Sequence, residues 1–190
     1  MKQSKYKIIA LVGKSGAGKD TILKELCKNS SFHQIITSTT RPKRDYEKQD
    51  IDYHFLTIED FSQKILNGDM IEATSFNNDW FYGTDINDLK EDKINVGVFN
   101  PAGIECIIED NRLDLVIIYV TASEKTRLLR NLNREENPNC HEICRRFLAD
   151  EKDFSYIESL DNIYIYQNEN KNDLQGINEF IQVFNFSNIM

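Results

Sequence analysis

A glycine-rich stretch near the N-terminus has the residue types of a phosphate-binding loop. Residues 13–20 read GKSGAGKD. Glycines at 13, 16 and 18 let the backbone curl so that successive N–H groups point at one spot, and a helix that follows adds its positive end there. Lys19 supplies a mobile positive charge. The stretch therefore predicts a site for nucleotide phosphates, made by Gly13, Ser15, Gly16, Ala17, Gly18, Lys19, Asp20 and Thr21.

The last residue of this loop departs from the usual pattern, in which a serine or threonine follows the lysine. Asp20 places a carboxylate there. A carboxylate oxygen is a hard ligand that suits magnesium, although its charge repels phosphates unless a metal or an arginine neutralises it. We expect Asp20 to bind magnesium directly or through water, with the Thr21 hydroxyl in reserve.

Two groups of basic residues stand out in this acidic chain. One is the run 39–44, TTRPKR, and the other comprises Arg127, Arg130, Arg134, Arg145 and Arg146. Planar guanidinium groups suit phosphoryl oxygens that gain charge during transfer. Arg130 and Arg134 are four residues apart, so we expect one helix face to present both to a single anion. The alternative is a solvated surface on which single arginines pair with Glu135, Glu136 or Glu142.

The elements that must position these residues follow from the hydrophobic pattern. Residues 7–12 form a short apolar run that ends at glycine, which predicts a buried strand leading into the loop. Residues 21–28 place apolar side chains at helical spacing. The loop is therefore expected to lie between a strand and a helix, which makes the phosphate-site prediction far more specific than the glycines alone.

The rest of the chain alternates strands and helices. Further strands are predicted at 94–99, 113–120 and 163–166, and further helices at 101–109, 123–134, 141–153 and 173–184. Such alternation implies a parallel sheet with helices on both faces. The segment 38–93 interrupts the rhythm: it is polar and rich in aromatic residues, with a helix at about 58–67 and strand-like pieces such as 70–76. It is predicted to be an inserted subdomain.

Length and charge limit the classes of function. The 190 residues fit one domain, and the formal net charge of -8 with a pI near 5.0 argues against non-specific binding of nucleic acid, which needs a basic surface. The longest apolar run is far shorter than the roughly 18 residues of a membrane helix, and the N-terminus lacks the apolar core of a cleavable leader. We expect a cytoplasmic protein with no membrane partner, as a monomer or homodimer.

The cysteines give a weaker signal. Cys27, Cys106, Cys140 and Cys144 show no paired spacing, so reduced thiols are expected. Cys140, His141 and Cys144 could share a helix face and hold zinc, but a structural zinc site needs four ligands and no second pair is present.

Taken together, these motifs resemble the guanylate kinase family of nucleoside monophosphate kinases. The resemblance covers most of the chain and rests on ordered motifs: GKSGAGKDT at 13–21, STTRPKR at 38–44, DYHF at 52–55, MIEA at 70–73, FYGT at 81–84, and RNLNRE at 130–135 followed by CRRF at 144–147. It implies an α/β fold of the P-loop kinase type: three layers with a central parallel sheet, an inserted subdomain that binds the nucleoside monophosphate, and a small helical lid. It also implies ATP as phosphoryl donor, magnesium, and small nucleotide substrates.

The resemblance assigns roles along the chain, which is expected to be a single domain over 1–190. The core would comprise 1–37 and 94–190, the nucleotide-binding insertion about 38–93, and the lid about 130–146. The transferred phosphoryl group would be met by Lys19, Arg130, Arg134 and one of the two arginines Arg145 and Arg146. The acceptor nucleotide would be held by Thr37, Ser38, Arg41, Arg44, Tyr53, Glu72, Tyr82, Gly83, Thr84 and Asn100.

Within the acceptor site, the resemblance implies one set of residues for the phosphate and another for the base. Arg41, Arg44, Tyr53 and Tyr82 would hold the acceptor phosphate, while Glu72, Thr37 and Thr84 would face the base. A carboxylate such as Glu72 can accept hydrogen bonds from both N1–H and the exocyclic amine of guanine, whereas adenine offers no matching pair of donors. GMP or dGMP is therefore the expected acceptor.

The chain departs from the family pattern after the predicted strand 94–99. The family usually has D-x-D-x-x-G there, whereas residues 98–103 read VFNPAG. Val98 and Asn100 thus replace both carboxylates. We hypothesise that Asp20 supplies the negative charge lost at Val98, and that Asn100 alters the strictness of guanine selection.

Alternatives of several classes remain at this stage. A glycine loop ending in Lys-Asp also resembles ribose 1,5-bisphosphate kinases and phage-type deoxynucleotide kinases, which changes the acceptor. Guanylate kinase-like domains that have lost catalysis act as binding modules, although these typically lack a complete glycine loop. A GTPase is suggested by NKND at 170–173, but the D-x-x-G that should precede it is absent. The resemblance places that region beside the adenine of the donor instead.

Overall fold

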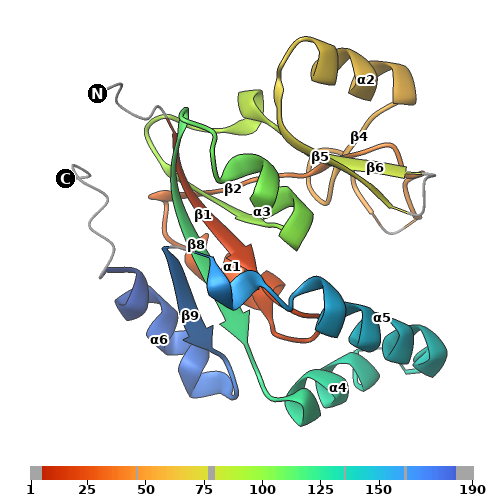
Figure 1. Ribbon diagram of the computed structural model, residues 1–190, viewed down its shortest axis with the longest axis vertical. Coiled ribbons are helices and arrows are strands. Elements are labelled where there is room, and N and C mark those ends of the chain that lie inside the picture. Colours follow the sequence, from red (N-terminus) through yellow and green to blue (C-terminus); the bar gives the residue numbers. More distant parts are fainter. Residues whose placement is uncertain (1–5, 46, 77–79, 135, 161, 183–190) are drawn as a thin grey trace.

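A five-stranded, fully parallel sheet forms the centre of the protein (Figure 1). The computed structural model describes residues 6–45, 47–76, 80–134, 136–160 and 162–182. Across the sheet the strands run β2 (Phe32–Gln34), β7 (Ile94–Val98), β1 (Tyr6–Val12), β8 (Leu113–Thr121) and β9 (Ile163–Gln167). β1 is the central strand, and chain order reverses on either side of it. Ligands of open α/β sheets bind at the carboxyl ends of the strands beside such a point.

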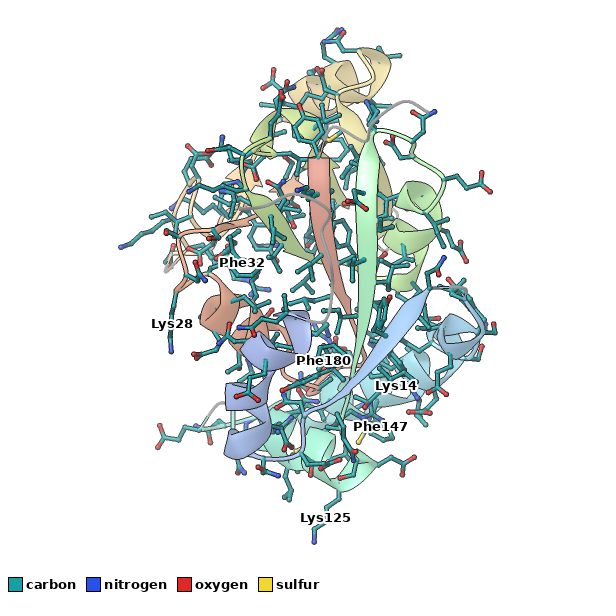
Figure 2. All side chains as sticks on the ribbon, turned by 90° about the vertical axis from the view of Figure 1, so that its left-hand side faces the viewer. Lys14, Lys28, Phe32, Lys125, Phe147 and Phe180 are labelled. Carbon is teal, nitrogen blue, oxygen red and sulfur yellow. The ribbon has the colours of Figure 1, made fainter. Side chains whose placement is uncertain are left out.

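Helices cover both faces of this sheet because side chains alternate along β1. Ile8, Ala10 and Val12 pack in one buried cluster with side chains of α3 (Pro101–Ile107). Ile9 and Leu11 pack in a second cluster with α1 (Lys19–Leu26) and α6 (Lys171–Gln182). The result is the three-layer arrangement predicted from the sequence. At one edge, Tyr166 of β9 meets Phe180 of α6 with ring centroids 5.0 Å apart, and Figure 2 labels Phe180 on that helix.

Side-chain caps fix where the remaining helices begin. The Thr57 hydroxyl accepts from Asp60 N–H at the start of α2 (Ile58–Leu66), and Ser123 does the same for Thr126 N–H before α4 (Glu124–Leu132). Asn139 caps α5 (Cys140–Asp153). Each cap satisfies an N–H group that has no partner within its helix. Short 3₁₀ turns follow at Ile86–Asp88 (η1) and Ile157–Ser159 (η2).

A second, smaller sheet is built from the segment between β2 and β7. Its order is β4 (His54–Phe55), β3 (Ser38–Thr39), β6 (Trp80–Asp85) and β5 (Met70–Phe76), with β6 antiparallel to both neighbours. Phe61 of α2 is buried and its ring lies 5.8 Å from that of Phe81. Figure 1 shows this sheet with α2, and the helices α4 and α5, as separate lobes on the same side of the main sheet.

The predicted elements are confirmed, and several of them begin or end at other residues than predicted. The helix after the glycine loop begins at Lys19 rather than Thr21, so Lys19 and Asp20 lie in its first turn. The helix predicted over 123–134 ends at Leu132. The helix predicted over 173–184 begins at Lys171 and is described to Gln182, while residues 183 and 184 lie outside the described residues. β2, β3, β4 and β6 were not predicted individually. β2 has three residues and β3 and β4 have two each, which is too few to carry a pattern, whereas the six residues of β6 were not recognised as a strand.

None of the described helices is long and apolar enough to cross a membrane.

Candidate functional site

The glycine loop lies at the carboxyl end of β1 and is held from behind. Gly16 and Gly18 have φ angles of 80° and 98°, a region in which residues with a Cβ are strained. Arg130 Nη1 donates to the carbonyls of Gly16 (3.3 Å) and Ala17 (3.2 Å), and Asn168 Nδ2 donates to the Ala17 carbonyl (2.8 Å). In a trans peptide the N–H points opposite to the carbonyl, so the Gly18 N–H turns away from these donors.

The ammonium group of Lys19 lies against the backbone of the glycine loop. Its Nζ donates to the carbonyl of Gly13 at 2.5 Å. Burial lowers the pKa of Lys19, while the carboxylates of Asp20 and Asp150 act in the opposite direction. Anions beside the ammonium group therefore favour its charged form, and a bound phosphate would act in the same direction.

A cavity of about 690 Å³ opens in front of the loop and reaches the second sheet. Its walls come from the loop, β2, β5, β6, the end of β7, α5 and the segment 41–53. Of the residues predicted from the sequence, it is lined by Gly13, Ser15, Lys19, Asp20, Thr37, Arg41, Arg44, Tyr53, Glu72, Tyr82, Asn100, Arg145 and Arg146. Residues far apart in the chain thus meet in one space, large enough for two small ligands to approach each other.

The other predicted residues lie behind or beside this cavity: Gly16, Ala17, Gly18, Thr21, Ser38, Gly83, Thr84, Arg130 and Arg134. Gly83 is enclosed, since a Cβ there would lie 2.7 Å from the Glu72 carbonyl oxygen. Ser38 is buried, and its hydroxyl has no hydrogen-bond partner within the described residues. Thr84 reaches the cavity only through the side chain of Glu72.

Arg130 and Arg134 do not share a helix face, so the predicted reason for one anion to meet both is wrong. Helix α4 ends at Leu132, so Arg134 lies beyond it. Arg130 points at the back of the glycine loop, where its Nη2 also donates to the carbonyls of Asn168 (2.9 Å) and Glu169 (3.2 Å). Arg134 instead approaches Asp20, with 3.9 Å between Nη2 and Oδ2.

Arg41 is buried and already holds an internal carboxylate. Its Nη2 lies 2.7 Å from Glu47 Oε1, and the other oxygen of Glu47 accepts the Arg44 N–H at 2.8 Å. The guanidinium carbon stands 5.4 Å from the ring centre of Tyr53. Glu47 raises the pKa of Arg41. The group is therefore a rigid, permanently charged donor on the cavity wall.

Glu72 is the carboxylate whose ionisation is most altered in the cavity. It lies on β5 with 8% of its surface exposed, and Thr84 Oγ1 donates to its Oε1 at 2.9 Å. Burial raises the pKa of Glu72 to about 7, and the hydrogen bond from Thr84 only partly opposes this. A desolvated carboxylate with one oxygen fixed by a neighbour is set to accept from a planar donor edge.

Asn100 faces the same part of the cavity but also starts α3. Its Oδ1 accepts the Gly103 N–H at 2.7 Å and caps that helix. This explains why an asparagine is stable after β7: the carbonyl oxygen serves the helix, and the amide NH₂ is left for the cavity. One of the two lone pairs of the oxygen expected to accept from a ligand is thus already in use.

Arg145 and Arg146 line the cavity from α5 while pairing on their own helix. Arg145 contacts both oxygens of Glu142 (2.7 and 2.9 Å), and Arg146 Nε contacts Oε1 (2.7 Å). These two arginines lower the pKa of Glu142 to about 2. The expected surface pairing with Glu142 therefore holds for both, whereas Glu135 lies outside the described residues.

Sequence reasoning missed the partners of the predicted residues: Glu47, Asn131, Asp150, Glu151 and Asn168. Asn168 directly follows β9, so the rule that sites gather at the carboxyl ends of parallel strands pointed to it. Asp150 lies four residues after Arg146 and shares its helix face, which the predicted helix over 141–153 implied. Their contacts with the loop, more than 130 residues away, carried no local signal.

The NKND motif at 170–173 has a structural role. In NKND, the Asp173 carboxylate accepts the N–H groups of Glu169 and Asn170 (2.8 and 3.0 Å) and so shapes the turn before α6. Among the described residues, no group of three or more Cys, His, Asp or Glu side chains is arranged to hold a metal ion.

Comparison with known proteins gives a consistent family. The guanylate kinase family model matches residues 5–183. The guanylate kinase of Wigglesworthia glossinidia brevipalpis is 32% identical over 189 residues, covering 95% of this chain and 88% of that protein. That of Malacoplasma penetrans (strain HF-2) is 30% identical over 154 residues, covering 76% and 77%.

The fold agrees with these sequence relatives. The crystal structure of guanylate kinase from Anaplasma phagocytophilum superposes with a TM-score of 0.66 at 22% identity, covering 96% of this chain and 88% of that one. The interpretation as a P-loop kinase fold with a central parallel sheet is thereby confirmed. The chain belongs to the guanylate kinase family.

Proposed function

We propose that this protein transfers the γ-phosphoryl group of ATP to GMP or dGMP. The observation that carries the proposal is that residues of the glycine loop with Lys19 and Glu72 of the second sheet line one cavity. A phosphate site and a base-reading carboxylate in one space allow a donor and an acceptor nucleotide to meet. Family membership supports the same reaction.

The acceptor nucleotide would lie along the second sheet. Glu72 would accept from N1–H and the exocyclic amine of guanine, with Thr84 holding one of its oxygens in place and Thr37 beside it. Arg41 and Arg44 would bind the acceptor phosphate together with the hydroxyls of Tyr53 and Tyr82. Because Glu47 already positions Arg41, little side-chain entropy is lost when the phosphate arrives.

The donor phosphates would lie on the glycine loop. The acceptor phosphate would attack the γ-phosphoryl group in line, while Lys19, Arg145 and Arg146 take up charge on the oxygens around the phosphorus. Arg145 and Arg146 must then exchange Glu142 for phosphate. Arg130 acts from behind the loop, as a positioning residue that keeps the loop's N–H groups turned forward.

Magnesium is the metal that this chemistry implies, and the residues present fit it. Asp20 lines the cavity next to Lys19 with most of its side chain exposed, so its hard oxygens are accessible. Val98 lines the same cavity without offering an oxygen. Asp20, with Thr21, would hold the ion, which shields the charge between the phosphates. Titrating manganese by electron paramagnetic resonance against wild type and Asp20→Ser, with ATP present, should show weaker ion binding in the variant; equal binding would exclude Asp20.

The proposal assigns different roles to different segments of the chain. Residues 38–93 would serve as the acceptor-binding subdomain and 130–146 as the lid, within one domain over 1–190. Small nucleotides would be the partners of a monomer or homodimer, without nucleic acid or membrane. Because ATP and GMP are cytoplasmic metabolites, the reaction implies a cytoplasmic location.

A panel of acceptors tests the proposal. ADP release from ATP is followed with GMP, dGMP, dTMP, AMP, CMP and ribose 1,5-bisphosphate, with the Lys19→Met variant as control. We expect turnover with GMP and dGMP at least 100-fold above the other acceptors, and loss of turnover in the variant. Turnover confined to another acceptor would reject the guanine assignment, and ATP binding with no turnover would reject the kinase.

A further inference from the structure

A carboxylate of the protein itself lies on the glycine loop. Asp150, on α5, accepts the Ser15 N–H with its Oδ2 at 2.5 Å. Ser15 is in the middle of the loop, 135 residues away in sequence. A loop N–H that is expected to bind donor phosphate is therefore occupied by an internal anion.

The surroundings of Asp150 are those that a phosphate would meet. Burial raises the pKa of Asp150, while the Ser15 N–H and the charges of Lys19 and Arg127 act in the opposite direction. Asp150 lines the cavity together with Ser15 and Lys19. The carboxylate and a donor phosphate would thus compete for the same partners, and two anions cannot share so small a space without strong repulsion.

Helix α5 holds this carboxylate in place through its next residue. Glu151 binds Lys14 of the loop (2.6 Å) and Nη2 of Arg127 on α4 (2.9 Å). Figure 2 shows Lys14 and Phe147 at the same end of the molecule, and Arg127 lies over the Phe147 ring at 4.5 Å. The loop, α4 and α5 are therefore joined by one charged network, so Asp150 does not reach the loop as a freely moving side chain.

Arg127 offers a second partner for Asp150. Its side chain is 4% exposed, and its Nη1 is buried with no hydrogen-bond partner among the described residues. Such a guanidinium donor is costly to leave unpaired. The charge of Arg127 also acts on the ionisation of Asp150, so this unpaired Nη1 is the candidate partner for the carboxylate once Asp150 leaves the loop.

We propose that Asp150 is a resident anion of the glycine loop, which competes with the donor's phosphate for the Ser15 N–H and sets the affinity for the donor. Phosphate binding moves the carboxylate from Ser15 to Arg127. The inference rests on the proposed function for the identity of ATP, but the competition itself concerns any phosphate on the loop.

The test compares affinities for two probes, ATP and inorganic pyrophosphate, by calorimetry. The variants are Asp150→Ala, Asp150→Asn and the control Asp153→Ala, which removes a carboxylate from the same helix and cavity but not one bonded to the loop. We expect Asp150→Ala to bind both probes roughly tenfold more tightly, about 1.4 kcal/mol. Asp150→Asn should fall between it and wild type because the amide keeps a hydrogen-bond acceptor without the charge. Asp153→Ala should change affinity less than threefold, and GMP affinity should change less than twofold in all variants.

Two outcomes would overturn the competition. Weaker or unchanged binding in Asp150→Ala would mean that Asp150 assists the donor or does not meet it, and equal gains in Asp153→Ala would mean a general charge effect. Tighter pyrophosphate binding without turnover of any nucleotide would uphold the competition while the proposed function fails. Arg127→Met tests the second partner: the affinity gained by Asp150→Ala should be larger in that background, because Asp150 then has nowhere else to go. An equal gain in both backgrounds would remove Arg127 from the exchange.

Discussion

At the scale of single residues, the buried carboxylate of Glu72 destabilises the empty protein but is positioned to bind the acceptor base. Its carboxylate is nearly buried, and burial raises its pKa to about 7. Near neutral pH the side chain is therefore divided between its charged and protonated forms. Only the charged form can accept two hydrogen bonds from guanine, so acceptor affinity should fall as pH drops below about 7.

Glu72→Gln should stabilise the empty protein at alkaline pH. The folded-state pKa is raised from 4.5 to about 7, so between these values the folded state retains a proton that the unfolded state loses, and stability falls as pH rises through this window. Above it the full penalty applies, about 3 kcal/mol. Glutamine has no such penalty, and it still accepts from Thr84. Urea unfolding at pH 5 and pH 8 should show that the free energy of unfolding of the variant, relative to wild type, is higher at pH 8 by up to that amount. The variant Glu109→Gln, at an exposed position, controls for the type of substitution. An equal difference at both pH values would contradict the burial argument.

The same substitution should impair the reaction. A neutral amide offers one acceptor where guanine needs a pair, so kcat/KM for GMP should fall roughly 100-fold while the KM for ATP stays within about twofold. Steady-state kinetics with each substrate varied separates the two effects. An equal loss for both substrates would instead indicate a general distortion of the cavity.

At the scale of elements, the strand, glycine loop and helix could be predicted because their signal is local. Apolar runs, glycines and caps are read within a few residues, and they placed the sheet, α1 and the loop close to their observed positions. The partners of the loop could not be predicted in this way. Arg130 has the type of a phosphate ligand, but it packs against the loop's carbonyls because α4 crosses behind the loop, and that crossing is a tertiary feature.

The loop itself should tolerate no side chain at Gly16. A Cβ there would lie 2.4 Å from the Arg127 carbonyl oxygen, in addition to the strain of its φ angle of 80°. Gly68 has a similar φ of 75°, but no atom lies within 4 Å of its would-be Cβ. Gly68→Ala should therefore cost only the backbone strain, about 1–2 kcal/mol. Gly16→Ala should cost clearly more and weaken ATP binding at least tenfold, measured by thermal unfolding and calorimetry. Similar losses for both variants would show that the close approach is unimportant.

Substituting one arginine of α4 and one of α5 should have different effects. Arg130 supports the structure of the glycine loop, whereas Arg146 is proposed to act in the reaction. Arg130→Met removes the donor to two carbonyls of the glycine loop and to two carbonyls after β9, and it should lower the free energy of unfolding by about 2–3 kcal/mol. Arg146→Met removes an exposed side chain whose observed partner is Glu142, and it should leave stability within about 0.5 kcal/mol while lowering kcat roughly 100-fold or more. Denaturation curves and kcat values for both variants check this. A stable Arg130→Met with unchanged ATP affinity would contradict the supporting role.

At the scale of the whole molecule, the cavity unites motifs that the chain keeps far apart. The sequence identified most of its wall by residue type, from Lys19 to Glu72 and the arginines of α5. It did not reveal that internal carboxylates already occupy these cations and N–H groups: Glu47 on Arg41, Glu142 on the α5 arginines, and Asp150 on Ser15. Pairing across a fold depends on distances that no local pattern encodes. The acidic chain thus keeps its phosphate-binding groups neutralised and ordered while it is empty.

The central claim is that this cavity joins ATP to a guanine nucleotide for direct phosphoryl transfer. It is tested most directly by mixing excess enzyme with ATP, magnesium and GMP and separating the nucleotides by anion exchange over time. The account predicts that GDP and ADP form together in equal amounts, and that neither forms when GMP is omitted. ADP formed without GDP, or GMP left unchanged while ATP is bound, would contradict it.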